Sequence, residues 1–78
     1  MKTIEDVRAY LKREQEIARD PATPEWQIFT MLSRLAEGCS SVEQFIKQAQ
    51  ELPIAGPAEE ANEARQWLTI ALETIQGE

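Results

Sequence analysis

The spacing of apolar residues along the chain predicts helices and no strands. Apolar side chains recur every three or four residues over four segments, residues 4–19, 24–37, 41–52 and 57–76. No segment shows the strict alternation of apolar and polar residues that marks a half-buried strand. Because the connections between these segments are short, successive helices are expected to pack antiparallel or at a steep angle. The pattern therefore predicts one all-α domain, a compact bundle of four helices spanning residues 1–78.

Capping residues support the starts and ends of these helices. Thr3 and Thr23 precede the first and second apolar patterns and are expected N-caps. Ser40, followed three residues later by Glu43, matches a capping box for the third helix. Gly38 is expected to end the second helix in a left-handed conformation.

The inner faces of the first three helices follow from the same periodicity. Each face contains the apolar residues that share one side of the helix. The residues expected inside are Ile4, Val7, Tyr10, Leu11, Ile17, Ala18, Ile28, Phe29, Leu32, Leu35, Ala36, Val42, Phe45, Ile46, Ala49 and Leu52.

The last helix has the widest apolar arc. Trp67, Ile70 and Leu72 flank its inner stripe, so that the arc covers about 200° of the helix, against about 100° for a helix with one neighbour. Such a helix must be covered from more than one side. Either it is the central helix of the bundle, or Trp67, Ile70 and Leu72 form a partner-binding surface. The stripe itself consists of Ala61, Ala64, Leu68, Ala71 and Ile75.

Charge is distributed unevenly along the chain. The formal net charge is −6. Residues 1–35 contain six basic and six acidic residues, whereas residues 36–78 contain two basic and eight acidic residues. Binding to a phosphate backbone requires clustered lysines and arginines, so this distribution disfavours nucleic acids and anionic membranes as partners. It favours a protein partner with a basic surface, since charge complementarity raises association rates.

Several sequence features predict a cytoplasmic protein. The single cysteine, Cys39, cannot form an internal disulfide bond. The first twelve residues contain charges where a signal peptide needs an apolar run, and no segment has the length and hydrophobicity of a membrane span. The expected setting is therefore reducing and cytoplasmic, with no membrane partner.

The residue types present predict no catalysis, no cofactor and no metal site. The chain contains no histidine, which excludes Ser–His and Cys–His nucleophile pairs and zinc sites that use imidazole. Cys39 alone cannot form a thiolate metal site, and its expected place is a turn where the side chain is partly buried. No glycine-rich phosphate loop or calcium loop is present. The neighbouring carboxylates lie on outward helix faces and are expected to be solvated.

Two resemblances to known families concern the serines and the turn before the third helix. The length, acidity and four helices are similar to those of acyl carrier proteins, in which the serine of an Asp-Ser-Leu motif at the start of the second helix carries the prosthetic group. Here the serine pair at a helix start is Ser40-Ser41, preceded by Cys39 and followed by Val42, so the motif is absent.

Residues 35–42 are similar in outline to a helix-turn-helix motif, because a glycine turn precedes a capped helix. In that motif the second helix presents polar side chains to the major groove. The corresponding residues here are Gln44, Lys47, Gln48 and Gln50, flanked by Glu43 and Glu51.

Together these features predict a small acidic protein–protein interaction module without catalytic activity. It would act as an adaptor, an inhibitor or a subunit of an assembly, through Trp67, Ile70 and Leu72, and its partner could be a second copy of the chain. The alternative is a helix-turn-helix-like DNA-associated regulator. A third possibility is that the acidic surface mimics DNA.

Overall fold

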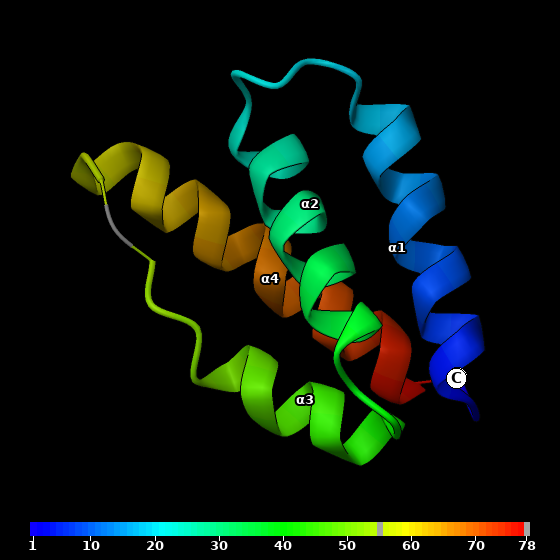
Figure 1. Cartoon of the computed structure of the whole chain (residues 1–78). Coiled ribbons are helices and arrows are strands. Elements are labelled where there is room, and N and C mark those ends of the chain that lie inside the picture. Colours follow the sequence, from blue (N-terminus) through cyan, green and yellow to red (C-terminus); the bar gives the residue numbers. More distant parts are fainter. Residues whose placement is uncertain (55, 78) are drawn as a thin grey trace.

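The structure is a computed structural model that describes residues 1–54 and 56–77. It contains the helices α1 (Ile4–Ala18), α2 (Pro24–Glu37), α3 (Val42–Gln50) and α4 (Ala58–Gly77), as Figure 1 shows. No strand occurs among the described residues. The radius of gyration of 11.7 Å is close to the value of about 11.5 Å expected for a compact chain of this length. The predicted all-α bundle of four helices is therefore confirmed, with helix ends that differ from the predicted ones by at most two residues.

The centre of the bundle is α2. It packs against each of the other three helices, whereas α4 packs chiefly against α2. In Figure 1, α2 crosses in front of α4 and has α1 at its side. The last helix is therefore not the central one, and its wide apolar arc is not explained by a central position.

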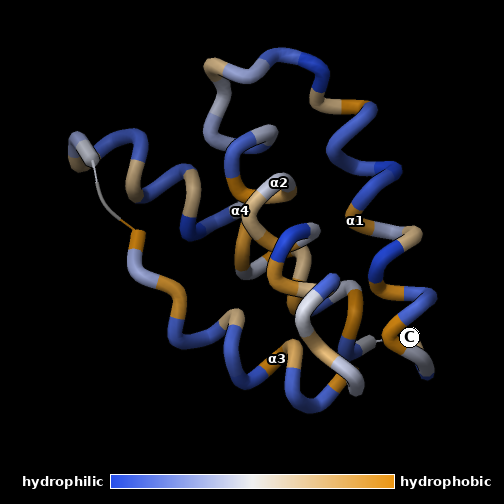
Figure 2. The backbone as a smooth tube through the Cα atoms, in the orientation of Figure 1, coloured by the Kyte–Doolittle hydropathy of each residue, from blue (hydrophilic) through white to orange (hydrophobic). Residues whose placement is uncertain are grey.

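The core consists of the inner faces expected from the periodicity. Figure 2 shows hydrophobic and hydrophilic segments alternating along each helix, as amphipathic helices require. Ile17 is the exception, because 61% of its surface is exposed. It lies about 100° around α1 from the line of Val7 and Leu11, which are both fully buried. The prediction that Ile17 faces the core is thus wrong. The buried apolar residues are Val7, Leu11, Ile28, Phe29, Leu32, Ala36, Cys39, Phe45, Ala49, Ala61, Ala64, Ala71 and Ile75.

Threonine and serine side chains cap three helix starts. The Thr3 hydroxyl accepts a hydrogen bond from the backbone N–H of Asp6 at 3.1 Å, and Thr23 caps α2 in the same way. Both of these predictions are confirmed. For α3 the capping residue is Ser41, whose hydroxyl accepts from the N–H of Gln44 at 3.1 Å. The predicted capping box of Ser40 and Glu43 is wrong by one residue. Each of the two successive serines has a hydroxyl that could cap the helix, and Ser41 is the one that does.

The ends of α1 and α2 use backbone geometries that the sequence did not indicate. Gly38 has φ −91° and lies in the right-handed region, so the predicted left-handed conformation is wrong. Instead α2 ends in a tight turn in which the N–H of Cys39 donates to the carbonyl of Ala36 at 3.2 Å. Arg19, after α1, has a positive φ of 58°. This conformation is costly for a residue with a Cβ.

Arg8 joins α1 to the turn between α2 and α3. Its Nε donates to the carbonyl of Ala36 at 3.0 Å, and its Nη2 donates to the carbonyl of Cys39 at 2.9 Å. Cys39 is fully buried rather than partly buried, and its Sγ lies 3.7 Å from Oε1 of Gln48. These contacts fix the end of α2 against α1.

Candidate protein-binding face

The structure separates the three residues predicted to bind a partner. Ile70 has 47% of its surface exposed, whereas Trp67 and Leu72 are half-buried and pack against the core. Trp67 and Ile70 are three residues apart and lie within about 60° of each other around α4. Leu72 lies about 160° from Ile70, on the opposite flank of the helix. The structure therefore brings Trp67 and Ile70 together on one side of α4 and leaves Leu72 on the other.

A row of three aromatic rings connects α4 to α1 through α2. The ring of Phe29 meets that of Trp67 edge-on, with centroids 6.2 Å apart. It meets the ring of Tyr10 in the same way, also at 6.2 Å. Phe29 is buried, whereas Tyr10 and Trp67 are half-buried. Edge-on pairs of this kind contribute about 0.5–1.5 kcal/mol beyond the area they bury. The row therefore holds the half-exposed Tyr10 and Trp67 in fixed positions.

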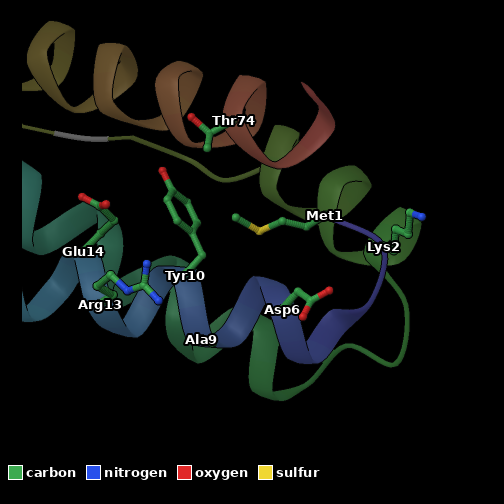
Figure 3. Close-up of a pocket in the computed structure, with 8 residues that line it drawn as sticks. All are labelled: Met1, Lys2, Asp6, Ala9, Tyr10, Arg13, Glu14 and Thr74. Atoms are coloured by element: carbon green, nitrogen blue, oxygen red, sulfur yellow. The ribbon is translucent and has the colours of Figure 1, made fainter. Parts of the chain in front are cut away.

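A hollow of about 620 Å³ lies between α1 and the last turns of α4. Figure 3 shows Tyr10 extending from α1 toward Thr74 of α4, with the Met1 side chain beside it. The α-amino group of Met1 donates to the carbonyl of Ile75 at 2.7 Å. The hollow is open because α1 and α4 both pack against α2 but scarcely contact each other.

Two exposed isoleucines lie outside this hollow, and Ile70 lines a second hollow with Arg65, Gln66 and Thr69. Ile17 follows Tyr10 by seven residues, and Trp67 precedes Thr74 by seven residues. Seven residues make about two helical turns, so each pair shares one flank of its helix. Ile70 lies beside Trp67. We name these two flanks, Tyr10 and Ile17 on α1 and Trp67, Ile70 and Thr74 on α4, the α1–α4 face.

Charges of both signs lie beside the α1–α4 face. Along the outer side of α4, three exposed glutamates lie near the line of Ile70. On α1, the residues that line the hollow include acidic and basic side chains. The charged residues concerned are Glu59, Glu63, Arg65 and Glu73 on α4 and Lys2, Asp6, Arg13 and Glu14 around the hollow.

No arrangement typical of metal binding or of nucleophilic catalysis occurs in the described part of the chain. The residues that the structure describes contain no group of three or more potential metal ligands. The thiol of Cys39 is buried and contacts an amide oxygen rather than a base. None of the described helices has the length and hydrophobicity needed to cross a membrane.

The residues of α3 expected to read DNA lie on its exposed face, but two of them, Gln44 and Gln48, accept hydrogen bonds from the turn before the helix. The side-chain oxygen of Gln44 accepts hydrogen bonds from the backbone N–H and the hydroxyl of Ser40, both at 3.0 Å. Lys47 is exposed between Glu43 and Glu51. A helix that reads the major groove depends on basic side chains around it to hold the phosphates, and α3 offers one lysine between two glutamates.

Sequence reasoning missed three members of the α1–α4 face, Tyr10, Ile17 and Thr74. The sequence could have indicated that Ile17 is exposed, since it lies about 100° around the helix from the line of Val7 and Leu11. For Tyr10 and Thr74 no signal was available, because their proximity depends on how α1 and α4 cross α2.

In comparisons with known proteins, no protein-family model, curated protein or solved structure matches this chain.

Proposed function

We propose that this chain is a small, non-catalytic protein–protein interaction module that binds a partner protein through the α1–α4 face. The observation that carries the proposal is the exposure of Ile17 and Ile70, which share the flanks of α1 and α4 with the partly exposed rings of Tyr10 and Trp67. Isolated apolar residues are common on protein surfaces. Two of them beside half-exposed aromatic rings held in place by a buried phenylalanine resemble the anchor residues of interfaces.

The magnitude of the apolar contribution supports a binding role. The exposed fractions of Ile17 and Ile70, 61% and 47%, together equal about one whole isoleucine side chain. Covering both would therefore contribute about 2 kcal/mol, or more than tenfold in affinity. Further burial of Tyr10 and Trp67 would add to this, since aromatic residues dominate the energetics of interfaces.

The acidic character of residues 36–78 supports a partner with a basic surface. Opposite charges on two partners raise the rate at which they meet, and salt screens the effect. The association rate should therefore fall as the ionic strength rises. The role would be that of an adaptor, an inhibitor or a subunit of an assembly, in the reducing cytoplasm that the single buried cysteine favours.

Photo-crosslinking in the cells that produce the protein tests the proposal. A benzoylphenylalanine residue would replace Ile70 in one variant and Met31 in a second. Met31 is a matched control, because it is 38% exposed but lies on α2, outside the α1–α4 face. We expect a defined adduct with another protein, or with a second copy, from position 70 and none from position 31. Equal labelling from both positions, or no adduct from position 70, would contradict the proposal.

The alternative function is DNA association through α2 and α3. It has less support, since the side chain of Gln44 accepts hydrogen bonds from Ser40 and Lys47 lies between two glutamates. A titration with random duplex DNA at low salt separates the two functions. Binding that weakens steeply as salt rises would favour the DNA-associated role.

A further inference from the structure

We draw no further inference here: the strongest candidate, the hollow on α4 lined by Arg65, Gln66, Thr69 and Ile70, adjoins the α1–α4 face already described, and nothing in the structure shows what covers it.

Discussion

Replacing Arg8 by methionine tests how the bundle is held together. The substitution keeps a long apolar stem but removes both hydrogen bonds to the carbonyls of Ala36 and Cys39, at 3.0 and 2.9 Å. Hydrogen bonds from a charged group contribute about 1.5–3 kcal/mol each when buried. Arg8 is half-buried, so solvent replaces part of what is lost. We therefore expect the free energy of unfolding to fall by about 2 kcal/mol for the pair.

Urea unfolding followed by circular dichroism measures this loss. With a urea dependence of about 1 kcal/mol per molar for a small domain, the midpoint should fall by about 2 M. Lys12→Met, at an exposed position of the same helix, is the control and should change the free energy by less than about 0.5 kcal/mol.

A second measurement follows from the contact with Cys39. Loss of Arg8 frees the turn between α2 and α3, so the buried thiol of Cys39 should react faster with a disulfide reagent in Arg8→Met than in Lys12→Met. Equal stability and equal thiol reactivity in the two variants would refute the assignment of Arg8 as the link between α1 and this turn.

Three further predictions concern the core and the end of α1. Phe29→Ala should lower the free energy of unfolding by about 3–5 kcal/mol, because Phe29 is buried between two rings. Its tryptophan emission in native buffer should shift to longer wavelength, because Trp67 loses the ring that covers it. In thermal unfolding, Leu11→Ala should lower the free energy of unfolding by about 2–5 kcal/mol, whereas Ile17→Ala should lower it by less than about 0.5 kcal/mol. Similar losses in the two variants would mean that Ile17 is buried in the core. Arg19→Gly should raise the free energy of unfolding by about 0.5–1 kcal/mol in the same assay, since glycine adopts a positive φ without steric cost. A decrease would mean that the Arg19 backbone is not strained.

Local sequence patterns predicted the helices well because each depends on residues close together in the chain. Val7 and Leu11 are four residues apart and share one face of α1 in any tertiary arrangement. Thr3 and Thr23 cap their helices through bonds to residues three positions away. Such features follow from backbone geometry alone.

The predictions for the start of α3 and the end of α2 were wrong because two local conformations are nearly equivalent at each place. Ser40 and Ser41 each offer a hydroxyl at the start of α3, and the Ser41 hydroxyl is the one that accepts from the N–H of Gln44. Gly38 could end α2 in either a left-handed or a right-handed conformation, and the right-handed turn is the one that directs the Cys39 carbonyl toward Arg8.

The candidate site was predicted only in part, because it depends on contacts between distant helices. The wide apolar arc of α4 correctly indicated that some of its apolar surface stays uncovered, and Ile70 is that residue. The sequence could not indicate that Phe29 covers one side of Trp67, or that Tyr10 and Thr74 lie across one hollow. These positions depend on α2 being the central helix, which no local pattern specifies.

The affinity of the crosslinked partner for three forms of the protein tests the central claim most directly. These are the wild type, the double variant Ile17→Ala with Ile70→Ala, and Met31→Ala, compared by isothermal titration calorimetry. Covering the two isoleucines contributes about 2 kcal/mol, so we expect the double variant to bind about tenfold to thirtyfold more weakly and Met31→Ala to bind as the wild type does. Unchanged affinity in the double variant, or an equal loss in Met31→Ala, would show that the α1–α4 face does not bind the partner.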